Sequence, residues 1–138
     1  MTKRKKLLFA AASLMCVATV GVVVHAAYDF APISDLGDGY VNVISSYSVT
    51  AWTTADERGN DDEDYVSVDF DAYTFGSTVW GPIDANGNDI GPVVNTGRAI
   101  EAYAENTDAG AIENVNSYHG IRRGEREVTI TIHGTPAG

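Results

Sequence analysis

Apolar and polar residues alternate with a period of two through most of this chain, and this pattern constrains its fold more than any other feature. Between residues 40 and 52, for example, Val41 falls on one face of an extended segment and Tyr40 falls on the other. The segments 65–75 and 127–133 repeat the alternation and are rich in residues that favour strands. A period of two is that of a β-strand with one buried face. The chain is therefore predicted to be all-β.

Glycine, asparagine and proline separate these segments and set the number of strands. Asn86-Gly87 predicts a tight hairpin turn, because a type I′ turn needs positive φ at both central positions. The segment 98–105 fits either a helix or a strand, and its shortness favours the strand. Further strands are expected at 78–80, 93–94 and 112–119. About seven short strands joined by such turns predict an antiparallel β-sandwich, immunoglobulin-like or jelly-roll-like.

The first 26 residues have the pattern of a secretory signal peptide. Four bases lie within the first six residues, an apolar run follows from Leu7 to Val24, and small residues precede a cleavage site after Ala26. We therefore expect a signal-peptide helix over 1–26, cleavage after Ala26, and a protein that is secreted, extracellular or held in the cell envelope. The apolar run is 18 residues long, near the minimum for a membrane span, so an uncleaved N-terminal membrane anchor is the alternative.

Cleavage after Ala26 would change the composition of the chain sharply. The remaining 112 residues contain five arginines, 19 acidic residues and no lysine, a formal net charge of −14. They contain no cysteine either, which excludes a disulfide scaffold, a thiol enzyme and a cysteine-zinc site. Binding to nucleic acid or to an anionic membrane is not expected, because both need a basic patch. The predicted organisation is a lead-in over 27–39, a single sandwich domain over 40–134 and a flexible tail over 135–138.

Two acidic loops indicate a calcium site. Residues 56–64 contain six carboxylates and residues 84–89 contain two, and calcium takes six to eight oxygen ligands of this kind. Alternate loops of an antiparallel fold lie at the same end, so strand parity predicts an acidic pole formed by these loops and 106–110. Loops 95–97 and 120–124 would form an arginine-bearing pole at the opposite end. The residues predicted to hold Ca²⁺ are Asp56, Asp61, Asp62, Asp64, Asp84 and Asp89. A solvated acidic surface without metal is the alternative.

A strip of acids and tyrosines on the 65–75 segment is the candidate ligand-binding surface. Tyr65, Asp69, Asp71 and Tyr73 share one face of that predicted strand. Tyrosine rings can stack on a sugar, and two carboxylates can divide the acid and base roles of a glycosidase. An outward polar face without any ligand is the alternative.

Nucleophilic catalysis finds little support in the sequence. Beyond the predicted leader there are two histidines, His119 and His133, and both are expected at the surface near strand ends. The sequence contains no G-x-S-x-G and no H-E-x-x-H motif. The chain is therefore not expected to be an enzyme.

These observations favour an exported, non-enzymatic β-sandwich that acts by binding or assembly, with a protein partner or with itself, and with calcium as a stabilising cation. A small secreted carbohydrate-binding module or hydrolase that uses the Asp69 and Asp71 face is the alternative. A secreted toxin or inhibitor is a third hypothesis.

Overall fold

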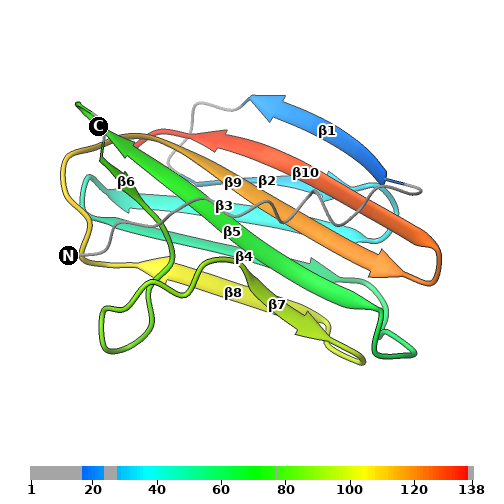
Figure 1. The fold of residues 1–138 in the computed structure, drawn as a ribbon. Helices are drawn as coiled ribbons and strands as arrows, with labels where there is room; N and C mark the ends of the chain where they lie inside the picture. The colour runs from blue at the N-terminus through cyan, green and yellow to red at the C-terminus, as the bar shows by residue number, and fades with distance from the viewer. Residues whose placement is uncertain (1–16, 24–27, 77, 137–138) are drawn as a thin grey trace.

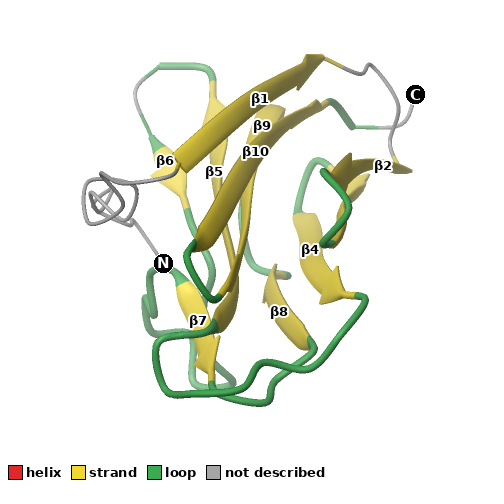
Figure 2. Cartoon of the chain, turned by 90° about the vertical axis from the view of Figure 1, so that its right-hand side faces the viewer, coloured by secondary structure: helices red, strands yellow, loops and turns green. Residues whose placement is uncertain are grey.

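Two antiparallel sheets pack face to face in the computed structural model, which describes residues 17–23, 28–76 and 78–136 (Figures 1 and 2). The larger sheet has the order β1-β10-β9-β5-β6, with β7 also paired to β5. The smaller sheet has the order β2-β3-β4-β8. All pairs of neighbouring strands are antiparallel except β1 with β10. The prediction of an all-β sandwich is confirmed.

The described residues form ten strands, more than the seven expected. Their bounds are β1 Val17–Val23, β2 Tyr28–Ile33, β3 Gly37–Ser45, β4 Ser48–Ala55, β5 Tyr65–Thr74, β6 Val79–Trp80, β7 Val93–Thr96, β8 Glu101–Asn106, β9 Ile112–Arg123 and β10 Arg126–Gly134. The segment that fitted either a helix or a strand is strand β8. A hairpin turn at Asn86-Gly87 is present, since Gly87 has a φ of +83° and Ile83 pairs with Asp89. Asn86 does not have a positive φ, so the turn is not of the type I′ expected from the sequence.

The apolar faces predicted from the alternation meet in the core between the two sheets. Val41 on β3 and Val49 on β4 face Val68 on β5 and Ile130 on β10, and none of these side chains is more than 1% exposed. Removing apolar surface from water in this way is the main force that holds the sheets together. No disulfide is needed for a core of this size, as the cysteine-free sequence beyond residue 26 indicated.

The long strand predicted over residues 40–52 is two strands, and this accounts for part of the excess. β3 and β4 form a hairpin that turns at Ser46 and Tyr47, with Ser45 opposite Ser48. The turn contains no glycine, asparagine or proline, and its sequence marker is the weaker one of serine: the Ser45 hydroxyl accepts a hydrogen bond from the Tyr47 N–H at 3.1 Å. The alternation also continues through it, because a bulge between Val43 and Ser45 keeps the apolar residues of both strands on the core side.

The structure does not support the predicted signal-peptide helix. In the described part of residues 1–26, Val17–Val23 forms strand β1, which pairs in parallel with β10. The other residues of the leader and its cleavage site lie outside the described residues. Within the described ranges no helix is long and apolar enough to cross a membrane. Part of the predicted lead-in, residues 28–33, forms β2 at the edge of the smaller sheet.

A histidine lies between the sheets, where the sequence pattern gave no reason to expect one. His119 is 1% exposed, so the expectation of a surface imidazole is wrong. Its Nδ1 lies 2.9 Å from the Thr53 hydroxyl, and its Nε2 lies 2.8 Å from the Ser117 hydroxyl. Thr53 donates its own hydrogen to the Ser67 carbonyl oxygen, at 2.7 Å. Both imidazole contacts are satisfied by a neutral ring that carries its hydrogen on Nδ1.

Gly39 makes room for this imidazole. A Cβ at position 39 would lie 2.5 Å from the His119 ring, a distance that real Cβ atoms do not adopt. The requirement is one of space, since Gly39 is not among the glycines with positive φ. At this position the lack of a side chain lets the smaller sheet approach the His119 ring closely.

We expect Gly39→Ala to destabilise the protein by about 1–3 kcal/mol, the usual cost of overpacking a core. Chemical denaturation would measure the change. Gly110→Ala is the matched control, because a Cβ there would meet nothing within 4 Å. Adding Gly39→Ala to His119→Ala should cost much less than adding it to the wild type. Equal costs in the two backgrounds would contradict the proposed steric conflict.

Burial lowers the pKa of His119 from its ordinary value of 6.5 to about 3, opposed in part by a hydrogen bond to the Trp52 backbone. Below pH 6.5, His119 therefore binds a proton in the unfolded chain but stays neutral in the folded chain. Stability should be complete above that pH and should fall by about 1.4 kcal/mol per pH unit below it. Urea unfolding at several pH values between 5 and 8 would test this, and His119→Ala should weaken the dependence. A flat profile would contradict the assignment.

Candidate functional site

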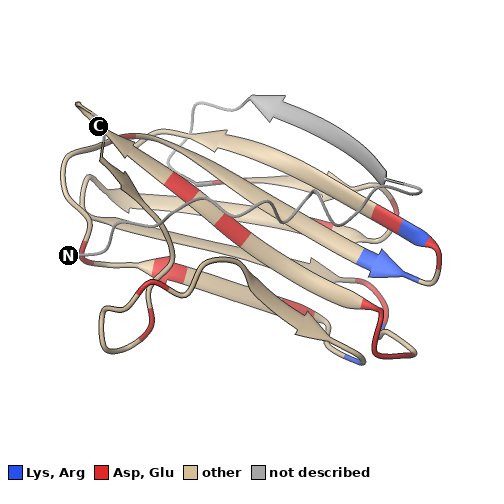
Figure 3. Cartoon of the chain, in the orientation of Figure 1, with Lys and Arg blue, Asp and Glu red and all other residues tan. Residues whose placement is uncertain are grey.

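The six aspartates predicted to hold calcium lie at two opposite ends of the sandwich. The 56–64 loop follows β4 and packs against the turn between β9 and β10, where the Gly124 N–H donates to Asp64 at 2.8 Å. The 84–89 loop lies beside the far end of β8, where the Ile83 N–H donates to the Glu105 carbonyl oxygen at 3.0 Å. Figure 3 shows acidic residues at both ends and arginines beside the first loop. The predicted acidic pole is therefore wrong, although the 84–89 and 106–110 loops do share an end.

The parity argument failed because β6 and β7 run in the same direction. Both pair antiparallel with β5, β6 along residues 72–73 and β7 along residues 65–68. Residues 81–92 thus leave the edge of β5 and rejoin it without a reversal of the chain. A turn-rich segment of this kind looks like an ordinary hairpin between two antiparallel neighbours when only the sequence is read.

Charge-assisted hydrogen bonds hold the 56–64 loop. Arg123 donates to the carbonyl oxygens of Glu57 at 2.8 Å and of Ala99 at 2.9 Å, tying two loops to β9. Asp64 is 1% exposed. Burial raises its pKa, but N–H donors from Asn60 and Gly124 outweigh burial and leave the pKa below its usual range. This carboxylate is thus occupied in fixing the loop.

In the 84–89 loop, the Asp84 carboxylate also accepts hydrogen bonds from N–H groups of its own loop. The Asp84 side chain accepts hydrogen bonds from the N–H groups of Asn86 at 2.8 Å and Asn88 at 3.0 Å, the pattern of an Asx turn. Backbone donors of this loop lower the pKa of Asp84, with the N–H of Asn88 as the largest cause. Over the described ranges, no group of three or more His, Cys, Asp or Glu side chains is arranged to hold a metal ion.

The predicted ligand strip on β5 is buried and already hydrogen-bonded. Asp69 is 5% exposed and Asp71 is 1% exposed, on the side of the larger sheet that faces away from the core. Asp69 accepts a hydrogen bond from the Phe70 N–H at 2.8 Å. Asp71 accepts from the hydroxyls of Tyr118 at 3.0 Å and Tyr73 at 3.5 Å. The structure therefore brings Asp71 and Tyr73 together, but as parts of an internal polar network.

Two members of this network lie outside the predicted strip. Tyr65 donates a hydrogen bond to the Glu127 carboxylate, which β10 supplies. Tyr118 lies on β9 opposite Asp69 and reaches diagonally to Asp71. Burial, followed by the charge of Asp71, raises the pKa of Tyr118, so its hydroxyl stays protonated as a donor. The pairing of β5 with β9 would have been needed to find Tyr118 from the sequence.

Four aromatic side chains form a row across the outer face of the smaller sheet. Phe30, Tyr40, Trp52 and Tyr103 occupy directly paired positions on β2, β3, β4 and β8. Successive ring centroids lie 5.8, 5.0 and 6.4 Å apart, and the Tyr40 and Trp52 rings are within 4° of parallel. Directly paired residues of neighbouring strands are the ones whose side chains touch. The register of the sheet therefore builds this aromatic row.

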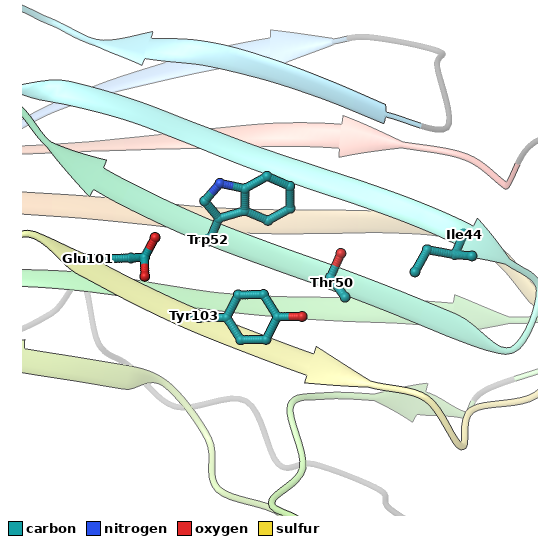
Figure 4. A pocket seen from close by; sticks show the side chains of 5 residues that line it. All are labelled: Ile44, Thr50, Trp52, Glu101 and Tyr103. Atoms are coloured by element: carbon teal, nitrogen blue, oxygen red, sulfur yellow. The ribbon is translucent and has the colours of Figure 1, made fainter.

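The aromatic row is open to solvent. Phe30 is 55% exposed and Tyr103 is 48% exposed, with Tyr40 and Trp52 half-buried between them. In the close view onto the smaller sheet, the Trp52 and Tyr103 rings turn their faces rather than their edges toward the viewer (Figure 4). An open pocket of about 430 Å³ lies over β4 and β8. Its lining residues are Ile44, Thr50, Trp52, Glu101 and Tyr103.

Polar rows flank the aromatic row on both sides. Asp38, Thr54 and Glu101 are paired positions on one side, and Asn42, Thr50 and Glu105 are paired positions on the other. The Tyr103 hydroxyl donates to the Glu105 carboxylate at 3.0 Å. Burial and this neighbouring carboxylate raise the pKa of Tyr103. The face thus combines flat apolar rings with hydrogen-bond acceptors.

The sequence did contain a signal for this face. Tyr40 and Trp52 fall on the same outward face in the alternation, and Tyr103 falls on the outward face of the next strand to pair with it. Without the hairpin at Ser46 and Tyr47, however, the first two appear twelve residues apart on one strand rather than side by side.

No family model, no curated protein and no solved structure matches this chain. Inference about function therefore rests on the geometry of the described residues.

Arg123→Ala should loosen both loops at its end of the sandwich. We expect a loss of stability of about 1–3 kcal/mol, because several hydrogen bonds to a charged donor disappear together, and faster proteolysis within residues 56–64. Arg126→Ala is the control. Its ion pair with Asp35 at 2.7 Å is exposed, with 51% and 75% of the two side chains accessible, so its loss should have little effect. Equal cleavage rates in the two variants would contradict the conclusion that Arg123 holds the two loops in place.

Proposed function

We propose that this chain is an exported, immunoglobulin-like or jelly-roll-like β-sandwich that binds carbohydrate through the aromatic row without catalysing a reaction. The export part of the proposal rests on the basic start, apolar run and cleavage pattern of residues 1–26. The carbohydrate part rests on one observation, the exposed row of Phe30, Tyr40, Trp52 and Tyr103 between two polar rows.

The chemistry of this face suits a sugar ring. A pyranose presents flat C–H surfaces and a rim of hydroxyls, so it can stack on aromatic faces while its hydroxyls donate to nearby oxygens. The side chains of Asn42, Glu101 and Glu105 supply such acceptors next to the rings. Exposed aromatic rows also stabilise a sheet through cross-strand contacts. That role alone does not require the rings at both ends of the row to stay about half exposed.

The site favours binding over hydrolysis. A glycosidase places two carboxylates on either side of the scissile bond, with room for sugar or water between them. Asp69 and Asp71, the pair that could have served, are buried and accept hydrogen bonds from the chain itself. They also lie on the larger sheet, whereas the aromatic row lies on the smaller sheet. Binding without turnover therefore accounts for more of the observed contacts.

Removing an exposed ring should weaken carbohydrate binding without unfolding the sheet. We expect Tyr103→Ala and Phe30→Ala each to reduce affinity about two- to twelvefold, which corresponds to the about 0.5–1.5 kcal/mol that aromatic pairs contribute beyond their buried area. Affinity electrophoresis in gels containing soluble polysaccharides would screen ligands. Quenching or enhancement of the Trp52 fluorescence would then measure affinity for the best one.

Phe75→Ala is the matched control, because Phe75 is 78% exposed but follows β5 in the larger sheet. It should leave affinity unchanged. If no polysaccharide binds and Tyr103→Ala instead alters the oligomeric state, the face is a protein interface and the proposed function is wrong. Equal losses in Tyr103→Ala and Phe75→Ala would also contradict it.

A further inference from the structure

We infer that the aromatic row selects glycans that carry free amino groups over glycans that carry carboxylates. This inference rests on the proposed function and deepens it, since it names the charge of the sugar. Three observations carry it: the charges in the rows beside the rings, the place of one carboxylate in the pocket, and the positions of the arginines.

The flanking rows carry negative charge without positive charge. Asp38 and Glu101 lie in one flanking row and Glu105 lies in the other, and no paired position of the three rows is Lys or Arg. Glu101 and Glu105 are exposed. A carboxylate that approaches these side chains meets like charges on both sides of the rings, whereas an ammonium group meets opposite charge.

Glu101 lies where a charged group on a stacked sugar would reach. It lines the pocket of about 430 Å³ together with Trp52 and Tyr103, the two rings whose faces are seen in Figure 4. An ammonium beside these rings gains twice, from the carboxylate and from the negatively polarised faces of the aromatic rings. A neutral sugar gains only stacking and hydrogen bonds there.

None of the five arginines beyond residue 26 lies in the aromatic row or its flanking rows, since Arg58 and Arg98 lie in loops and the other three lie at or beside the turn between β9 and β10. Arg123 is bound to backbone carbonyl oxygens at the end of the sandwich, and Arg126 pairs with Asp35 in the turn before β3. Arg122 donates to the Gly124 carbonyl oxygen in the same region. Figure 3 shows the blue segments gathered at that one end. The field at the centre of the smaller sheet is therefore set by its acidic residues.

The test compares three oligosaccharides of equal length: a hexosamine oligomer with free amines, the same oligomer N-acetylated, and a uronic acid oligomer. Binding would be measured by tryptophan fluorescence at low and at high salt, at a pH at which the amines are charged. We expect the amine oligomer to bind most tightly, the acetylated oligomer less tightly and the uronate least. High salt should narrow these differences, because exposed charges are screened.

Charge-neutral variants locate the effect. Glu101→Gln and Glu105→Gln should each weaken binding of the amine oligomer about two- to fivefold, as expected for exposed ion pairs, and should weaken binding of the acetylated oligomer less, because glutamine keeps one acceptor oxygen. Glu125→Gln, in the turn between β9 and β10, is the control and should change neither.

The outcomes separate this inference from the proposed function. Equal binding of the amine and acetylated oligomers, unaffected by Glu101→Gln, would overturn the charge selection and leave carbohydrate binding in place. Tightest binding of the uronate would overturn it as well. Failure of all three oligomers and of the polysaccharide screen would overturn both.

Discussion

The contact between Gly39 and the His119 ring is the constraint on which much of this structure depends. Gly39 and Thr53 are paired positions on β3 and β4, and both point toward the imidazole between the sheets. Because side chains alternate along a strand, the next residues, Tyr40 and Trp52, must then point outward. The buried contact therefore sets the parity of the smaller sheet, and the parity places two aromatic rings side by side on its outer face. The same buried site keeps the histidine neutral, because the groups that contact its ring nitrogens are uncharged hydroxyls and not anions.

The pairing of the strands, and not the order of residues along the chain, determines which charged loops lie at the same end of the sandwich. The most acidic loop, 56–64, lies at the end that carries Arg122, Arg123 and Arg126, and Arg123 fastens it through backbone carbonyl oxygens. The net charge of the residues beyond Ala26 thus does not resolve into two opposite poles. The rows at the centre of the smaller sheet contain Asp38, Glu101 and Glu105 and no arginine.

Much of the fold could be predicted from the sequence, and the failures share one cause. Period two identified the core-facing residues of the strands, such as Val41, Val68 and Ile130, because burial of one face leaves its mark on every second residue. Whatever depended on which strands pair was missed: the turn at Ser46 and Tyr47, the common direction of β6 and β7, and the aromatic row itself. The aromatic row joins residues from positions 30 to 103, and no local pattern encodes a contact over that separation. The candidate strip on β5 was placed on the right face of its strand, but its burial depends on neighbouring elements that the sequence does not specify.

The direction of the aromatic row has a consequence for how such a site can change. Its rings belong to four different strands, so the backbone positions that carry them repeat at the distance of about 4.8 Å between neighbouring strands. The side-chain conformations then place the ring centroids 5.0 to 6.4 Å apart. The backbone of the sheet therefore fixes the interval between the four positions of the aromatic row. Substitution at any one of the four positions can alter which chemical group of a ligand is recognised at that position. The interval between neighbouring positions would remain the same. A ligand whose units repeat at a different distance would require a sheet with a different arrangement of strands.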